Sequence, residues 1–198
     1  MNNLLKQNQD RLKLFKKYGY DIPKARNFII TKAKLTKGKI LEVGTGKGYM
    51  TIALAKKGFK LTSVDLDRKA QSIAKAGLKA IKLDKLVILK IMNAERLQYK
   101  DDSFDYVISV NFIHHAKNPV RCLNEMIRLA KDKLVIADIN KRGERIMQKV
   151  HGLDGHGHAA SKMSLQGVKA FLDKAGMSVK VYRDSCQTII IANKGTVK

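Results

Sequence analysis

Cysteine and proline are scarce in this sequence, with two of each among 198 residues, and tryptophan is absent. The two cysteines, Cys122 and Cys186, lie far apart, and neither has a C-x-x-C companion. The sequence therefore predicts neither a disulfide framework nor a thiolate metal site. Both stand within apolar patterns, so we expect them to be small buried side chains.

Long hydrophobic runs are also missing. No apolar run approaches the roughly 20 residues that span a bilayer, and the amino terminus is polar and punctuated by lysine, unlike the apolar core of a signal peptide. We therefore expect no membrane span and a cytoplasmic location. A hydrophobic content of 44% and this length suffice for one domain with a single sizeable core.

Acidic residues are few, because 17 Asp and Glu stand against 40 Lys and Arg, for a formal net charge of +23. This excess favours polyanionic partners, chiefly RNA or DNA. It is equally compatible with a lysine bias of genome composition or of a hot habitat. Residues 1–41 hold eleven basic and two acidic side chains, spread along a helical face.

The chain from Gly38 onward alternates apolar strand patterns with helical patterns. Strands are predicted at Lys39–Val43, Lys60–Val64, Leu86–Ile91, Phe104–Val110, Leu134–Asp138, Ser178–Tyr182 and Gln187–Ala192, and helices at Gly48–Lys57, Arg68–Gly77, Pro119–Ala130 and Leu165–Ala175. The alternation predicts an α/β fold, a doubly wound, mostly parallel seven-stranded sheet. Only four residues separate the last two strands, so they form an antiparallel hairpin at the carboxyl end. Two further helices, over residues 2–19 and from Pro23 to about Lys34, precede the sheet.

Three glycines, Gly44, Gly46 and Gly48, follow a buried strand and open a helix. Glycine allows a positive φ and a close approach of the backbone to a ligand, and the N–H groups of the helix amino terminus point at that ligand. Asp65 ends the next strand, where it can accept hydrogen bonds from ribose hydroxyls. A dinucleotide fingerprint would need glycine or alanine where Tyr49 stands. The spacing G-x-G-x-G fits S-adenosylmethionine better.

Four segments in order carry a resemblance to a known family: ILEVGTGKGYMTIALAKKG, LTSVDLD, NAERLQYKDDSFDYVISVNFIHHAKNP and LNEMIRLAKDKLVIADIN. Over roughly residues 38–140 the chain resembles the class I, seven-stranded, Rossmann-like S-adenosylmethionine-dependent methyltransferases, and within them the type 11, ubiquinone-biosynthesis-like branch. The resemblance implies one methyltransferase domain over residues 1–198, with residues 1–37 as a helical lid and 38–198 as the core.

The resemblance also implies a set of residues that bind S-adenosyl-L-methionine. The glycine loop would lie along the methionine part, Asp65 would bind the ribose, Leu66 would touch the adenine, and Asn93 with Ala94 would sit beside its amino edge. The implied residues are Glu42, Gly44, Thr45, Gly46, Gly48, Asp65, Leu66, Asn93, Ala94 and Asn111. Asn93 departs from the aspartate usual in the family, and the turn at Ala130-Lys131-Asp132 is unusually short.

Histidines are the candidate proton acceptors, because their pKa suits transfer near neutral pH. His114 and His115 resemble a common family pair after the fourth strand, and we take His115, His156 and His158 as candidate catalytic residues. The glycine-rich segment 151–158 holds three imidazoles and one carboxylate, which could bind a transition metal, orient an acidic substrate, act as a base, or form a plain solvated loop. We assign no metal.

The sequence thus predicts an S-adenosylmethionine-dependent methyltransferase that works by in-line displacement, for which the cofactor supplies the activated carbon. A small-molecule acceptor is favoured. The alternatives are an RNA- or protein-directed methyltransferase that uses the basic surface, and a non-catalytic binding subunit. A monomer and a homodimer are both compatible with the sequence.

Overall fold

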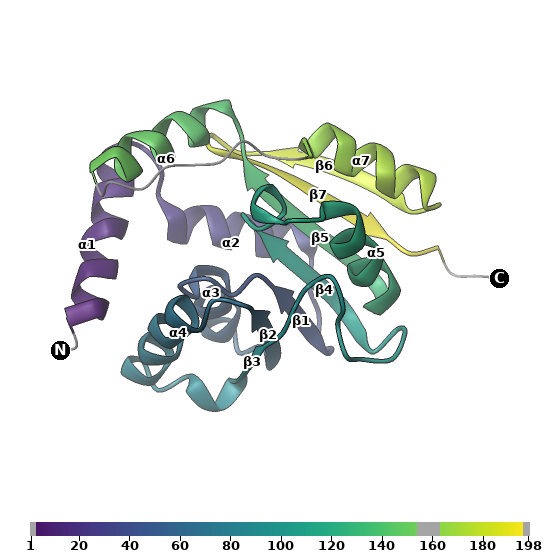
Figure 1. Ribbon diagram of the computed structural model, residues 1–198, viewed down its shortest axis with the longest axis horizontal. Coiled ribbons are helices and arrows are strands. Elements are labelled where there is room, and N and C mark those ends of the chain that lie inside the picture. The colour runs from purple at the N-terminus through teal and green to yellow at the C-terminus, as the bar shows by residue number, and fades with distance from the viewer. Residues whose placement is uncertain (1–2, 154–162, 196–198) are drawn as a thin grey trace.

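A computed structural model describes residues 3–153 and 163–195 as helices and strands around one central sheet (Figure 1). The helices are α1 (Asn3–Lys17), α2 (Ile22–Ala33), α3 (Tyr49–Lys56), α4 (Arg68–Ala80), α5 (Pro119–Leu129), α6 (Lys141–Leu153) and α7 (Leu165–Lys174), with short 3-10 turns at Asp84–Leu86 and Ile113–His115. The strands are β1 (Ile40–Val43), β2 (Leu61–Asp65), β3 (Val87–Ile91), β4 (Phe104–Val110), β5 (Ala130–Ile139), β6 (Ser178–Arg183) and β7 (Gln187–Asn193).

The strand order β3-β2-β1-β4-β5-β7-β6 confirms the predicted seven-stranded sheet. Strands β1 to β5 pair in parallel, while β7 is antiparallel to both β5 and β6. The chain leaves β1 toward β2 on one side, and β4 lies on the other side of β1. The carboxyl ends of β1 and β4 therefore flank the point where the strand order reverses, which is where open α/β sheets bind ligands.

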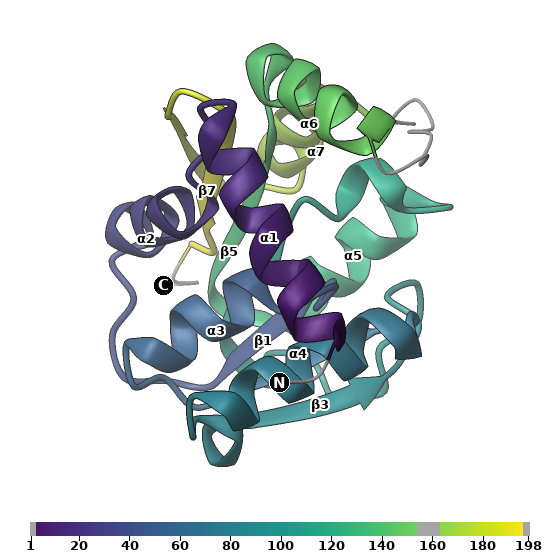
Figure 2. The same ribbon diagram turned by 90° about the vertical axis from the view of Figure 1, so that its left-hand side faces the viewer.

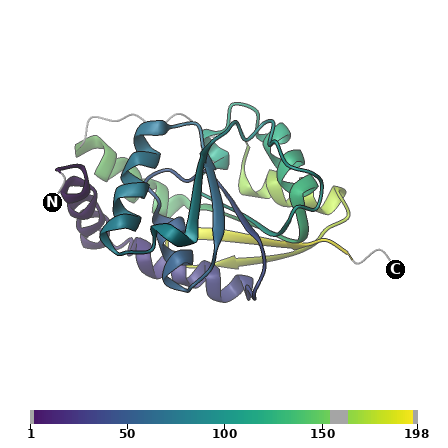
Figure 3. The ribbon, with the colours of Figure 1, turned by 90° about the horizontal axis from the view of Figure 1, so that it is seen from below.

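Helices cover both faces of the sheet, as the view from below shows (Figure 3). On one face α5 and α7 bury apolar side chains such as Leu123 and Leu172, and on the other α2 and α3 bury Ile29 and Leu54. A third apolar cluster joins α1, α2 and α6 through Phe15, Ile22, Val150 and others. Helix α1 consequently lies across the carboxyl ends of the strands, between α6 and α4 (Figure 2).

Two element boundaries differ from the prediction by three residues or more, for identifiable reasons. Helix α4 continues past Gly77 to Ala80. A Cβ at Gly77 would come within 3.1 Å of the Ile52 side chain, so this glycine serves helix packing and does not end the helix. Strand β5 begins at Ala130 and not at Leu134. No turn separates it from α5, because Ala130 already pairs with Phe104 of β4.

The cysteine prediction is confirmed, since Cys122 and Cys186 are both free and buried. In the part of the chain that the structure describes, no helix is long and apolar enough to cross a bilayer.

Candidate active site

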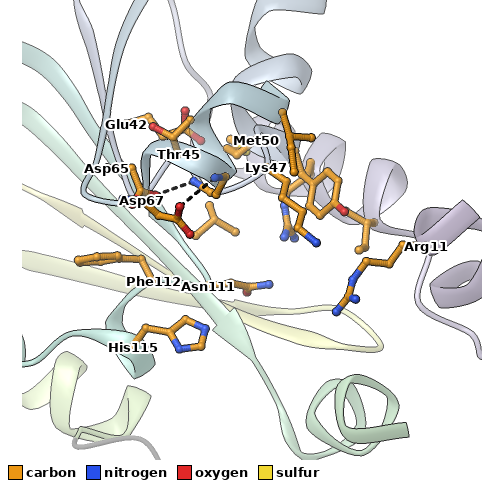
Figure 4. A pocket seen from close by; sticks show the side chains of 18 of the residues that line it. Arg11, Glu42, Thr45, Lys47, Met50, Asp65, Asp67, Asn111, Phe112 and His115 are labelled. Carbon is orange, nitrogen blue, oxygen red and sulfur yellow. Dashed lines mark hydrogen bonds between the residues drawn. The ribbon is translucent and has the colours of Figure 1, made fainter. Parts of the chain in front are cut away.

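A cavity of about 850 Å³ opens at the carboxyl ends of β1, β2 and β4 (Figure 4). Its floor is the glycine loop and the segment after β4, and residues of α1 and α6 close it from the other side. The volume lies toward the upper end of small-molecule pockets. Of the ten residues expected to bind the cofactor, seven line it: Glu42, Gly44, Thr45, Gly46, Asp65, Leu66 and Asn111.

The glycine loop is held by short backbone contacts that only glycine permits. Gly44 has a φ of 91°, and a Cβ there would lie 2.7 Å from the Cβ of Phe112. The N–H groups of Gly44 and Thr45 both donate to the carbonyl of Val64, at 2.9 and 3.1 Å. These contacts bring β1, β2 and the segment after β4 against one another, so a side chain at position 44 would force them apart.

Asp65 is fixed by two backbone donors. The N–H of Gly46 donates to its Oδ2 at 2.7 Å, and the N–H of Asp67 donates to its Oδ1 at 2.9 Å. The carboxylate is therefore oriented beside the loop and has lone pairs left for a ligand's hydroxyls. Leu66 follows it with 61% of its side chain exposed, which is unusual for leucine and suits an apolar contact with a planar ligand group.

Glu42 is a carboxylate buried in the wall of the cavity, only 1% exposed. Thr51 and Ser63 donate their hydroxyls to its Oε2 at 2.5 and 2.6 Å. Burial raises the pKa of Glu42 to about 7, against the opposing effect of those hydrogen bonds and of the Arg26 charge. Near neutral pH this group can therefore take up or release a proton when a charged ligand arrives.

Arg26 is a buried cation in the cavity wall, 3% exposed. Its Nη1 donates to the Tyr20 hydroxyl at 3.1 Å and to the Gln187 Oε1 at 3.0 Å, two neutral acceptors. Its Nε is buried without a hydrogen-bond partner, and no carboxylate forms an ion pair with Arg26 within the described ranges. A buried guanidinium with an unpaired Nε, and with only Glu42 as a nearby carboxylate, favours an anionic ligand group beside it.

The histidine pair lies where β4 and β5 end. His114 Nδ1 is 2.6 Å from Asp138 Oδ1, and the His115 ring packs 3.9 Å from the His114 ring, centroid to centroid. Both histidines line the cavity, and the His115 ring points into it (Figure 4). The carboxylate thus fixes the orientation of His114, which in turn supports His115.

Three of the residues expected to bind the cofactor do not line the cavity. Gly48 lies against α4, where a Cβ would come 2.6 Å from the Cβ of Ala74. Asn93 accepts a hydrogen bond from the N–H of Glu95, and Ala94 is buried in the core. The remaining catalytic candidates, His156 and His158, lie outside the described residues. No group of three metal-ligating side chains occurs in residues 3–153 and 163–195.

The resemblance implies a helical lid over residues 1–37, but the sequence does not predict which side chains of α1 line the cavity. Gln7, Arg11 and Phe15 of α1 all line it, as does Lys47 of the glycine loop. The three α1 residues recur at intervals of four, which places them on one stripe of the helix. This spacing can be seen in the sequence, but the sequence does not predict that this side of the helix faces a cavity.

Comparison with known proteins agrees with this geometry. The family Methyltransf_11, a methyltransferase domain, matches residues 41–136. One similar crystal structure is that of a protein from Methanococcus maripaludis, which is assigned as an S-adenosyl-L-methionine-dependent methyltransferase. It superposes with a TM-score of 0.74 and 20% identity, over 98% of this chain and 93% of that one. Residues 41–136 therefore match a methyltransferase-domain family, and the fold around them is that of S-adenosylmethionine-dependent methyltransferases.

Two further proteins are similar to this chain in fold or in sequence. Magnesium protoporphyrin IX methyltransferase from Synechocystis PCC 6803, with bound S-adenosylhomocysteine, superposes with a TM-score of 0.68 and 16% identity, over 94% of this chain and 87% of that one. A ubiquinone biosynthesis O-methyltransferase from Alkalilimnicola ehrlichii is 24% identical over 119 residues, 59% of this chain and 47% of that protein. The chain spans about half the length of the curated relatives it matches.

Proposed function

We propose that this protein transfers a methyl group from S-adenosylmethionine to a small-molecule acceptor. The observation that carries the proposal is the presence, in one cavity, of an oriented carboxylate beside a glycine loop and a buried guanidinium that lacks a carboxylate partner. Asp65 suits the ribose hydroxyls, and Arg26 suits the carboxylate of the methionine part. A ligand that carries both groups satisfies both residues at once.

The other proposed contacts follow from the same placement. Glu42 lies in the wall near Arg26 and suits the methionine ammonium group, while Thr45, Gly46 and Asn111 border the middle of the cavity. Leu66 offers the adenine an apolar face. Asn93 and Ala94 follow Met92, whose N–H donates to the Asp65 carbonyl at 3.1 Å, so they belong to the adenine end.

A small acceptor is favoured because side chains of α1 cover part of the cavity and narrow the space beside the glycine loop. Residues 3–17 thus act as the lid, which would exclude water from the reacting sulfur. The curated relative from Alkalilimnicola ehrlichii, by its name, serves ubiquinone biosynthesis, which is small-molecule chemistry. The net charge of +23 keeps RNA as the second candidate acceptor.

The cofactor supplies a methyl group on a positively charged sulfur. The chain has to hold the acceptor in line with it and accept a proton where the nucleophile carries one. His115 is placed for that proton, with His114 and Asp138 as positioning residues behind it.

Replacing His115 with asparagine should slow methyl transfer about 100-fold or more, because a positioned base contributes roughly this much. The measurement is the initial rate of label transfer to the acceptor between pH 5.5 and 9. Unchanged rates across that range would show that His115 moves no proton.

The proposed function is tested with labelled S-adenosylmethionine and fractionated cell extract, asking which fraction takes the label. Binding of S-adenosylhomocysteine is followed by calorimetry in parallel. Asp65→Ala should weaken binding by at least about tenfold, because charge-assisted hydrogen bonds to the ribose are lost. Asp67→Asn is the matched control, since it removes a neighbouring charge but keeps the acceptor for the Ala70 N–H.

Four outcomes separate the candidates. Label in a small-molecule fraction supports the proposal, and label in RNA or protein replaces it with the second candidate. Absence of binding by the wild-type protein would sink every methyltransferase assignment. Binding without transfer to any fraction would leave the non-catalytic subunit.

A further inference from the structure

Positive charge is concentrated on three helices that border the cavity. Helices α1, α4 and α6 together hold thirteen Lys and Arg against two acidic residues, Asp10 and Glu144. Twelve of the thirteen basic side chains are exposed, and Arg11 is half-buried. We call the exposed Lys and Arg of these three helices the basic face.

A general lysine bias of the chain does not explain this concentration. Helices α2, α3, α5 and α7 have the same combined length as α1, α4 and α6, yet they hold eight Lys and Arg and the same number of acidic residues. One of the eight, Arg26, is buried, and another, Arg128, forms ion pairs with two carboxylates. A compositional bias would load both sets of helices equally, so the excess belongs to one side of the molecule.

The three helices are neighbours in space. Figure 2 shows α1 in front, with α6 above it and α4 below it, and α1 contacts both. Each helix also contributes a residue to the lining of the cavity: Arg11 from α1, Lys69 from α4 and His151 from α6. The basic face is therefore a continuous surface that runs past the cavity.

The acidic side chains on and beside the basic face do not neutralise it. Asp10 and Asp21 each form an ion pair with one lysine of α1. Glu144 is exposed on α6, and Asp65 and Asp67 lie just before α4. These five carboxylates offset fewer than half of the twelve exposed cations, so the surface remains strongly positive.

The basic face carries charge without an apolar anchor. Within the part of the chain that the structure describes, none of the exposed large hydrophobic side chains belongs to α1, α4 or α6, since they are Leu66, Ile81, Ile88, Ile91 and Val120. A helix that lies on a membrane presents a row of apolar side chains that enter the lipid. The composition of the face consequently favours a solvated polyanion over a lipid surface.

We infer that the basic face binds the phosphodiester backbone of a nucleic acid, which lies across α6, α1 and α4 and passes the cavity. Lysine and arginine side chains neutralise successive phosphates, and the release of counterions drives such binding without regard to base sequence. The inference goes beyond the proposed function, because it concerns a surface that holds the protein on RNA or DNA whatever molecule the cavity methylates.

The test is fluorescence anisotropy with a labelled single-stranded RNA of about 20 nucleotides and with DNA of the same sequence, at several salt concentrations. The face variant replaces one exposed lysine of each helix, and its substitutions are Lys6→Gln, Lys75→Gln and Lys141→Gln. Its affinity for the strands should fall about 100-fold at about 0.1 M salt, because each phosphate contact contributes about 0.7 to the logarithmic salt dependence of binding to a single strand.

A matched control variant removes the same charge from exposed positions of α3, α7 and β6, by Lys56→Gln, Lys174→Gln and Lys180→Gln. Its affinity for the strands should stay within about threefold of the wild type, because these lysines lie outside the basic face. None of the six substituted lysines lines the cavity, so both variants should bind S-adenosylhomocysteine as the wild type does. Melting temperatures verify that the variants fold.

Equal losses in the two variants would overturn the inference, because binding would then follow the net charge of the chain and not this face. Absence of nucleic-acid binding by the wild type would also overturn it. Tighter binding to vesicles of phosphatidylserine and phosphatidylcholine, with the same dependence on the three helices, would replace the nucleic acid with a membrane. The tighter of the two strands identifies RNA or DNA as the partner. Failure of the wild type to bind S-adenosylhomocysteine would defeat the proposed function alone, since the strands are measured without it.

Discussion

Replacing Arg26 with methionine should weaken binding of S-adenosylmethionine and S-adenosylhomocysteine about 1,000-fold while the protein stays folded. Breaking a buried charge pair by removing one partner costs roughly 3–5 kcal/mol, and every 1.4 kcal/mol is about tenfold in affinity. Methionine fills a similar volume without charge. Calorimetric titration of both ligands gives the affinities.

The stability of the ligand-free Arg26→Met variant shows whether Arg26 serves cofactor binding or the folding of the protein. The Tyr20 hydroxyl still reaches the Gln187 Oε1 without Arg26, at 3.4 Å, and a buried charge without a carboxylate partner is removed. The ligand-free melting temperature should therefore hold or rise, while the increase on adding ligand disappears. Arg26→Lys keeps the charge with shorter reach and should fall between the two. A variant that unfolds, or that binds as the wild type does, contradicts the proposed contact.

Lowering the pH from 8 to 5.5 should stabilise the ligand-free protein through Glu42. Its pKa in the folded state is about 7, against an ordinary value of 4.5. Below pH 4.5 the group is protonated in both states and contributes no difference. As the pH rises through the window from 4.5 to 7, the unfolded chain loses the proton first, so unfolding becomes favoured. Above pH 7 the loss reaches about 3 kcal/mol, at about 1.4 kcal/mol per pKa unit.

The check on Glu42 is the free energy of unfolding by urea at several pH values for the wild type and Glu42→Gln. Glutamine still offers an acceptor oxygen to Thr51 and Ser63 but does not ionise. The variant should lack this part of the pH dependence and should be more stable than the wild type at pH 8. Parallel curves for the two proteins would show that Glu42 is ionised in the folded state throughout.

Much of the fold could be predicted because its signals are local. Apolar runs of five to seven residues, separated by helical patterns, predicted the sheet. The four residues between the last two strands predicted the hairpin. The predicted strand start at Leu134 and the predicted helix end at Gly77 were wrong, because the observed boundaries depend on contacts with distant residues. The residue types next to an element boundary do not reveal such contacts.

The residues of the site also divide into those that local sequence patterns predict and those that depend on distant contacts. The glycine loop and Asp65 are adjacent in pattern and could be predicted as one unit. The burial of Arg26 could not, because arginine in an amphipathic helix is ordinarily exposed, and its acceptor Gln187 is 161 residues away. The contact between His114 and Asp138 could be predicted in part. Both follow adjacent parallel strands, and the predicted sheet already implied that those strand ends meet.

The stripe of α1 that roofs the cavity has a consequence for how this scaffold can diversify. The carboxylates, glycines and buried arginine of the donor side belong to the sheet, to the loop after β1 and to α2, and each carboxylate and the arginine are held by hydrogen bonds to neighbouring residues. Gln7, Arg11 and Phe15 project from a single helix whose other faces are largely open to solvent. Three substitutions one turn apart can therefore present a new surface to an incoming molecule while the donor side is preserved. The residues proposed to hold the methyl donor and those of α1 that face them thus occupy separate stretches of the chain.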